Sequence, residues 1–184
     1  KKLFRSRLKN IYYPKVKFLK ETIKKKIKIL DFGCGSGHFV KACEDHDIIA
    51  TGIDPNYELI KIGRKNLKKN QLNHFNFECC IQKIKSSNAD LISLIFVLEH
   101  LEDPNLLFKA FIKSKARYLF LAVPIFSLSV FIENVFPNVY PRQLGGSHTH
   151  LFSNKSLKYI SNKYKLKTIG EWWFGSDFND LYRS

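Results

Sequence analysis

The stretch Ile29–Gly37, with the sequence ILDFGCGSG, decides the fold of this 184-residue chain. The apolar residues at its start predict a buried strand, and three glycines in five residues predict a tight turn before a helix that begins near His38. A glycine-rich turn between strand and helix lets another molecule approach the backbone, and it points unpaired N–H groups at that molecule. The stretch therefore predicts an α/β fold with a binding site at its first strand-to-helix turn.

Two acidic residues, Asp31 and Asp54, help to define what this site binds. Asp54 ends the next apolar run, at 48–53, where a carboxylate is placed to accept hydrogen bonds from ribose hydroxyls. A dinucleotide site has the spacing G-x-G-x-x-G, but this chain has D-x-G-x-G-x-G, with Asp31 two residues before the first glycine. A carboxylate there repels a pyrophosphate and suits an ammonium or sulfonium group. The spacing thus favours a cationic nucleoside and argues against an NAD-dependent dehydrogenase.

These residues resemble motif I of the class I S-adenosylmethionine (SAM)-dependent methyltransferases, and 52–55 (GIDP) resembles the acidic motif after their second strand. The resemblance implies SAM as cofactor and a Rossmann-like α/β fold, a doubly wound, mostly parallel sheet of seven strands. In it the glycines shape the loop around the methionine part, Asp31 faces the amino end and Asp54 holds the ribose. The implied cofactor-binding residues are Asp31, Phe32, Gly33, Cys34, Gly35, Gly37, Asp54, Pro55, Cys80, Ile81, Ile95 and Phe96.

Apolar runs and amphipathic stretches alternate along the chain, as in a parallel sheet wound with helices. They predict strands near 27–32, 47–53, 74–78, 90–96, 117–123 and 166–174, and helices near 12–25, 37–46, 55–69, 104–114 and 154–163. Six strands are one fewer than the family has, so we expect the terminal hairpin to be truncated. We expect a basic helical arm at 1–26 and a SAM-binding domain at 27–184. Its irregular segment 124–150 is expected to cover the acceptor.

Two segments carry the candidate acceptor chemistry. Residues 90–104 (DLISLIFVLEHLEDP) and 148–157 (HTHLFSNKSL) resemble segments of the type 11 and type 23 methyltransferases and of the ubiquinone-biosynthesis O-methyltransferases. An oxygen acceptor must lose a proton, which a histidine with a pKa near 6.5 can accept. His100, His148 and His150 are the candidate catalytic residues. The two on the expected cover, His148 and His150, are favoured, since His100 could equally orient Glu99 or cap the next helix.

A metal-binding interpretation competes with the histidine base. In the small-RNA 2′-O-methyltransferases, a Glu-x-x-Glu-His segment and a later histidine bind a divalent ion, and Glu99, His100 and either His148 or His150 match three of those ligands. Phe96 occupies the position of the first glutamate. Because the loss of a carboxylate weakens the binding of a hard cation, the sequence favours the histidine base and assigns no metal ligands. Whether a metal assists stays open.

Charge is concentrated at the N-terminus. The chain has a formal net charge of +15, and residues 1–28 hold twelve Lys or Arg and one acid. This excess suits an anionic partner such as RNA, a phospholipid surface or a lipid-phosphate-linked acceptor, but it also suits a solvated helix in a lysine-rich chain.

The function expected from these features is O-methylation of a small molecule or a glycan precursor. An RNA methyltransferase that uses residues 1–28, and a SAM-binding partner subunit without activity, are the alternatives. The apolar stretch 118–132 is too short to cross a membrane and contains Pro124. Four cysteines without C-x-x-C spacing fit a reducing cytoplasm. The oligomeric state stays open.

Overall fold

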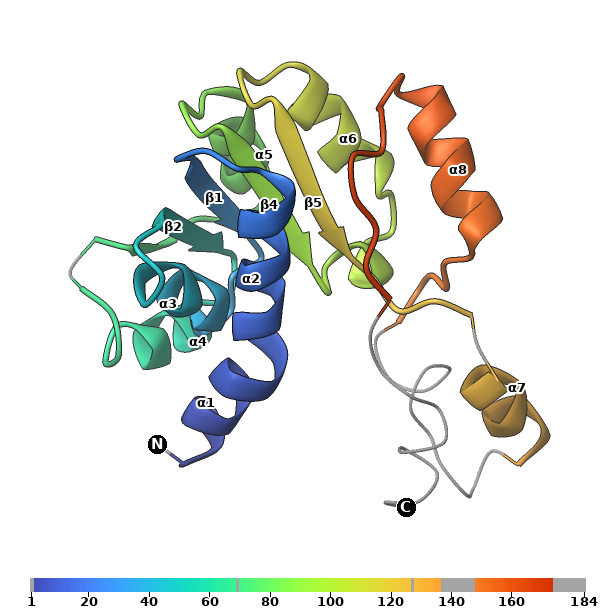
Figure 1. The fold of residues 1–184 in the computed structure, drawn as a ribbon, viewed down its shortest axis with the longest axis horizontal. Helices are drawn as coiled ribbons and strands as arrows, with labels where there is room; N and C mark the ends of the chain where they lie inside the picture. The colour runs from blue at the N-terminus through green and yellow to red at the C-terminus, as the bar shows by residue number, and fades with distance from the viewer. Residues whose placement is uncertain (1, 69, 127, 137–147, 174–184) are drawn as a thin grey trace. The chain divides into compact units, whose positions relative to one another are not determined.

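The computed structural model describes residues 2–68, 70–126, 128–136 and 148–173 (Figure 1). The described residues form two compact units. The first unit comprises the chain up to Val97 together with Asn105–Ala122, and the second comprises Leu98–Pro104 and the described residues from Val123 onward. None of the helices in the described ranges is long and apolar enough to cross a membrane.

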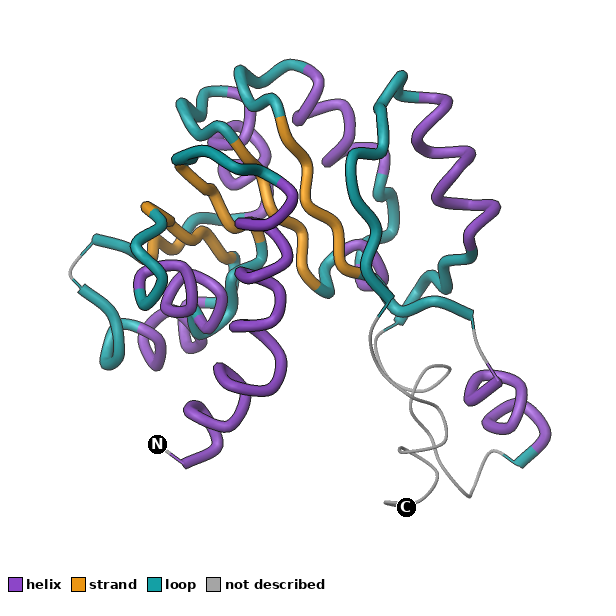
Figure 2. The backbone as a smooth tube through the Cα atoms, viewed as in Figure 1, coloured by secondary structure: helices purple, strands orange, loops and turns teal. Residues whose placement is uncertain are grey.

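The first unit is built on a parallel sheet of five strands in the order β3-β2-β1-β4-β5 (Figure 2). The strands are β1 (Lys28–Phe32), β2 (Ile49–Asp54), β3 (Leu72–His74), β4 (Leu91–Ile95) and β5 (Tyr118–Ala122). Every residue of β4 is buried, as expected for a parallel strand covered on both faces. The strand order reverses between β1 and β4, and the carboxyl ends at such a point are where ligands bind in this fold class. The Rossmann-like α/β fold predicted from the sequence is confirmed.

Both units contain helices. In the first unit they are α1 (Lys2–Arg7), the π-helical η1 (Leu8–Tyr12), α2 (Tyr13–Thr22), α3 (His38–Glu44), α4 (Tyr57–Gly63), α5 (Phe77–Lys85) and α6 (Asn105–Ile112). The second unit contains the 3₁₀ turn η2 (Leu98–His100), α7 (Leu128–Val135) and α8 (Asn154–Lys163). α2 packs against α3, and α5 packs against α6. Val16 and Leu19 of α2 belong to the hydrophobic core, so the basic N-terminal segment is also a packed part of the first unit.

Two predicted strands are wrong. The strand expected at 74–78 ends at His74, because the Asn76 side chain caps α5 by accepting the N–H of Cys79 at 2.8 Å. The described residues 166–173 form no strand, and residues 167–173 are exposed, so this run gains too little burial to be held in a sheet.

The segment 124–150, expected to be irregular, contains the helix α7. Near the two ends of this segment, Ile125 and Phe152 form an isolated parallel bridge, and the N–H of Phe126 donates to the carbonyl oxygen of Phe152 at 2.7 Å. Residues 137–147 of the expected cover lie outside the described residues.

Candidate functional site

The three glycines of the turn after β1 differ in how much space surrounds them. All three glycines have positive φ, at 70° for Gly33, 52° for Gly35 and 73° for Gly37. A Cβ added to Gly33 would lie 2.5 Å from Val97 Cγ2, and one added to Gly37 would lie 2.5 Å from Leu67 Cδ1. At Gly35 the nearest atom, Leu59 Cδ1, would be 3.8 Å away. Packing therefore requires glycine at 33 and 37, whereas Gly35 leaves space for a ligand.

Asp54, at the end of β2, ties this turn to the neighbouring strand. Its carboxylate accepts the N–H of Gly35 and the N–H of Asn56, each at 2.7 Å. A carboxylate offers about four acceptor positions, so the two oxygens of Asp54 can still accept two further donors. Its role in holding a ribose stays a prediction.

Asp31 lies in the interior of the first unit. It is 2% exposed, and the hydroxyl of Ser93 in β4 donates to its Oδ1 at 2.7 Å. Burial raises the pKa of Asp31 to about 7. A ligand ammonium beside it would favour the ionised form. The sequence analysis did not select Ser93, although a single hydroxyl inside the apolar strand LISLI is a visible signal.

Three further predicted residues surround the turn. Phe32 is buried, and its ring meets the ring of Phe77 edge-on at 6.1 Å. The buried side chain of Cys34 packs so close to Gly52 that a Cβ there would lie 2.6 Å from Cys34 Sγ. Pro55 is exposed, and its carbonyl oxygen lies 3.2 Å from Nε2 of His74.

Cys80 and Ile81 do not lie where the sequence analysis placed them. The strand predicted near 74–78 would have put both residues just after its end, but β3 ends at His74 and both residues belong to α5. Cys80 has no exposed surface, and its thiol donates to the carbonyl oxygen of Phe75 at 3.4 Å. The residues that follow β3 are Phe75 and Asn76.

Ile95 and Phe96 end β4. Ile95 is buried, and Phe96 is half-buried with φ +57°, a left-handed conformation that is uncommon for a bulky residue. The N–H of Phe96 donates to the carbonyl oxygen of Ala122 at 2.8 Å, which holds this turn against β5. The strain lies where the chain leaves the sheet at its switch point, the region that binds ligands in this fold class.

The N-terminal helices place a lysine and two aromatic rings over this part of the first unit. Lys15 is 1% exposed, its Nζ lies 5.1 Å from the Phe96 ring centroid, and burial lowers its pKa to about 8. The rings of Phe4 and Tyr12 stack on His38 at 4.1 and 5.3 Å. Burial, then the charge of Arg7, lowers the pKa of His38 to about 4, so it is neutral at pH 7. No local sequence signal separated Lys15 from its many lysine neighbours.

The second unit brings together Glu99, His100 and His148. One ligand atom from each lies within 4.8 Å of the others, and the two imidazole rings are 4.8 Å apart at 61°. Burial raises the pKa of Glu99, which is 1% exposed, while the nearby histidines lower it. His148 stands 48 positions after His100 in the sequence, and only the fold makes them neighbours.

Thr149 holds these segments together. Its N–H donates to the carbonyl oxygen of Glu99 at 2.7 Å, and its hydroxyl lies 3.0 Å from that oxygen and 2.9 Å from the carbonyl oxygen of Leu101. His150 lies outside the group: its Nδ1 is 2.9 Å from Thr149 Oγ1, and its ring stacks on Phe152. Thr149 was not selected from the sequence.

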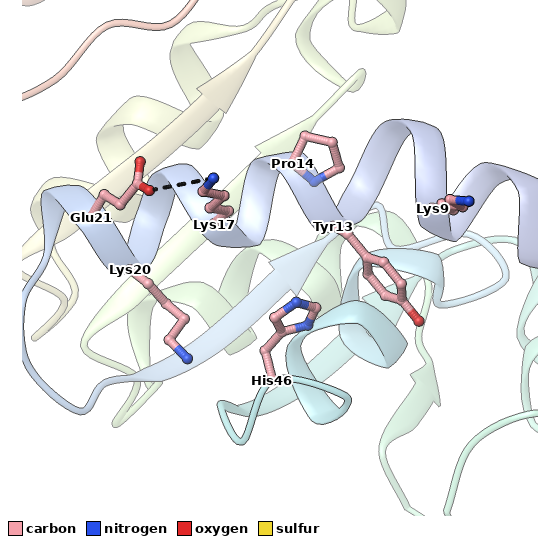
Figure 3. Close-up of a pocket in the computed structure, with 7 residues that line it drawn as sticks. All are labelled: Lys9, Tyr13, Pro14, Lys17, Lys20, Glu21 and His46. Carbon is pink, nitrogen blue, oxygen red and sulfur yellow. Dashed lines mark ion pairs between the residues drawn. The ribbon is translucent and has the colours of Figure 1, made fainter.

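A separate hollow of about 720 Å³ lies on the surface of the first unit. Figure 3 shows the side chains that line it: Lys9, Tyr13, Pro14, Lys17, Lys20, Glu21 and His46. The one ion pair drawn there, between Lys17 and Glu21, spans 3.9 Å. The lining shares no residue with the glycine turn, and its three lysines make it a candidate anion-binding surface.

Residues 4–169 match the type 23 family described as "Methyltransferase domain". The chain belongs to this methyltransferase-domain family. The cofactor of this chain is SAM. Among curated proteins, the chain is 29% identical over 161 residues to a carboxy-S-adenosyl-L-methionine synthase of Helicobacter pylori, a match that covers 81% of this chain and 66% of that protein.

Solved structures agree on the fold of this methyltransferase domain. A SAM-dependent methyltransferase from Archaeoglobus fulgidus matches with a TM-score of 0.58 and 21% identity, over 83% of this chain and 66% of that one. Magnesium protoporphyrin IX methyltransferase from Synechocystis, solved with bound S-adenosylhomocysteine, matches with a TM-score of 0.58 and 14% identity, over 89% and 71%. The chain thus spans just under two thirds of the length of the H. pylori and A. fulgidus proteins.

Proposed function

We propose that this domain transfers the methyl group of SAM to an oxygen atom of a small molecule or a glycan precursor. The observation that carries the proposal is the pair of neighbouring imidazoles, His100 and His148, with Glu99 beside them. An oxygen acceptor needs its proton removed, and imidazole is the side chain best suited to remove it near neutral pH.

On the cofactor side, the proposal assigns a role to each polar group of the turn. SAM, when bound, supplies a methyl group on a positively charged sulfur. The two oxygens of Asp54 bind the ribose hydroxyls, the open Cα of Gly35 admits the ligand to the backbone, and Asp31 faces the ammonium. The burial of Asp31 keeps water from competing for that ammonium.

On the acceptor side, His100, His148 and His150 are the proposed bases. Transfer of a methyl group needs the acceptor oxygen aligned behind the methyl carbon, so positioning is the main demand on the protein. One imidazole nitrogen accepts the hydroxyl proton as the oxygen–carbon bond forms. The carboxylate of Glu99 favours the imidazolium that results.

The experiment is methyl transfer from labelled SAM into a cell extract that is then separated into RNA, protein, lipid-linked glycan and small molecules. Asp54→Ala is the control, and calorimetry with SAM shows whether that variant has lost the cofactor. Label in the glycan or small-molecule fraction supports the proposal, and label in protein contradicts it. Mass spectrometry of the SAM pool checks the reaction named for the H. pylori relative: a SAM derivative that has gained a carboxyl group would replace methyl transfer as the assignment.

A second function, RNA methylation, is favoured by the lysine-lined hollow. Lys9, Lys17 and Lys20 would bind phosphates there, and such binding weakens steeply with salt. The variant with all three changed to Gln should lose salt-sensitive RNA binding if RNA is the substrate. Label that a nuclease removes from the fractionated extract would establish this alternative and refute the first.

A further inference from the structure

We propose that Glu99, His100 and His148 form a binding site for one divalent transition-metal ion of the zinc class. The group offers one carboxylate oxygen and two imidazole nitrogens, all within 4.8 Å of one another. The sequence alone argued against a metal because it lacked a fourth ligand at Phe96. The structure changes that argument, because it brings three ligands together. Three protein ligands are enough for a zinc-type metal whose fourth position is taken by water or substrate.

The burial of Glu99 is the first support. This residue is 1% exposed, and its Oε2 has no hydrogen-bond partner within the described part of the chain. A buried carboxylate oxygen without a donor is costly, and such groups are normally paired or coordinate a metal. The two neighbouring imidazoles are themselves metal ligands when neutral. A cation between them would compensate the orphaned oxygen.

The backbone provides the second support, because its own hydrogen bonds hold the ligands close together. The N–H groups of Thr149 and His150 both donate to the carbonyl oxygen of Glu99, at 2.7 and 3.3 Å. These bonds fix the segment that carries His148 beside the turn that carries Glu99 and His100. A preformed arrangement lowers the ordering cost that a metal must otherwise offset.

The donor set selects the metal. Imidazole suits zinc, copper, iron and nickel, whereas Mg²⁺ and Ca²⁺ prefer oxygen ligands. At zinc–ligand distances of about 2.0–2.1 Å, tetrahedral ligands lie about 3.3 Å apart. The atoms here are within 4.8 Å, so side-chain rotations that close the group by about 1.5 Å would complete the site.

The consequence for chemistry rests on the proposed function. Three protein ligands leave one position open, where an acceptor hydroxyl could bind and lose its proton more readily. With a metal bound, His100 and His148 act as ligands, and His150 is the histidine left to accept the proton.

The test is calorimetric titration of the purified, chelator-treated chain with Zn²⁺, with Co²⁺ as a spectroscopic substitute and Mg²⁺ as comparison. We expect one Zn²⁺ per chain, and an affinity at least about 100-fold lower in Glu99→Gln and in His148→Asn. His150→Ala is the matched control, because it removes a neighbouring imidazole outside the group, and its zinc affinity should equal that of the wild type. Circular dichroism of each variant confirms that it is folded.

Three results would overturn the metal site: no zinc binding at micromolar concentrations, an equal loss in His150→Ala, or a preference for Mg²⁺. Labelled-SAM assays on the same samples keep the two proposals apart. Zinc binding without transfer to an oxygen acceptor leaves the metal site standing and contradicts the proposed function. Transfer to an oxygen acceptor without any zinc binding supports the proposed function and overturns the metal site.

Discussion

At the scale of single residues, the burial of Asp31 and Lys15 in the interior of the first unit is costly. Asp31 is 2% exposed and Lys15 is 1% exposed. Burial raises the pKa of Asp31 to about 7 and lowers that of Lys15 to about 8. Both shifts disfavour the charged form. Natural proteins tolerate such costs mostly at sites that bind ligands.

Asp31 should make SAM affinity depend on pH. The ammonium of SAM is matched by the ionised carboxylate, so affinity should fall up to about tenfold per pH unit below pH 7 and level off above it. In the protein without SAM, the effect of Asp31 on folding stability has the opposite dependence on pH. The folded state holds a proton that the unfolded state releases above pH 4, so this residue's contribution to stability falls as the pH rises from about 4 to about 7.

Calorimetry with SAM from pH 5 to 8, on the wild type and Asp31→Asn, measures the first effect. Denaturant unfolding of both proteins over the same range measures the second, and the difference between them isolates Asp31. A SAM affinity with the same pH profile in both proteins would show that Asp31 does not face the ammonium.

Lys15→Met should stabilise the protein. At pH 7 the folded state carries a buried ammonium whose pKa of about 8 lies below the ordinary value, and the variant removes that cost while keeping the apolar stem. We expect the free energy of unfolding to rise by about 2 kcal/mol. For the wild type, stability from this residue grows as the pH rises from about 8 to about 10, because the folded state then releases the proton first.

Urea unfolding at pH 7 checks this expectation, with exposed Lys20→Met as the control that should change little. A Lys15→Met protein less stable than the wild type would mean that the contacts of the ammonium outweigh its desolvation.

At the scale of elements, the glycines of the turn after β1 can be tested separately for packing and for ligand binding. Gly37→Ala should cost about 2–4 kcal/mol of stability, since its Cβ would meet Leu67 and Leu72 in a left-handed conformation. Gly35→Ala has space for its Cβ and should cost only about 1–2 kcal/mol, but the methyl group would occupy the ligand's approach. SAM affinity in Gly35→Ala should therefore fall at least about tenfold. Thermal unfolding and SAM calorimetry measure the two effects, and Gly35→Ala with unchanged affinity would refute the assignment.

The elements also show how far the sequence could predict the fold. The runs that became β1, β2, β4 and β5 are largely apolar and contain β-branched or aromatic residues, which agrees with their place in a parallel sheet. The third strand was misplaced because the Asn76 cap outweighs the strand preference of Phe75 and Phe77. Glycine spacing and Asp54 were enough to predict a cofactor side, since these residues lie close together in the sequence, and their assignment to SAM stays a prediction. The His100–His148 pair needed tertiary structure, because 48 residues separate its members.

At the scale of the whole molecule, the basic N-terminal segment combines a buried apolar face with a high positive charge, and a deletion would remove both at once. Residues 1–28 carry a net charge of +11, yet Leu8, Val16, Leu19 and Ile23 are buried in the core. Whether this segment also acts as a separate functional arm stays a prediction. Its charged face is exposed at Lys17 and Lys20, while Val16 and Leu19 point inward.

Deletion of residues 1–26 should therefore unfold or severely destabilise the domain, by several kcal/mol, because full burial of each large apolar side chain contributes about 1.5–3 kcal/mol. The Lys9, Lys17 and Lys20 to Gln variant changes the charge alone and should keep its melting temperature within a few degrees. Circular dichroism melts of the two proteins make the comparison. If the deleted protein melts like the wild type, the segment is an independent arm after all, and truncation becomes a valid test of RNA binding.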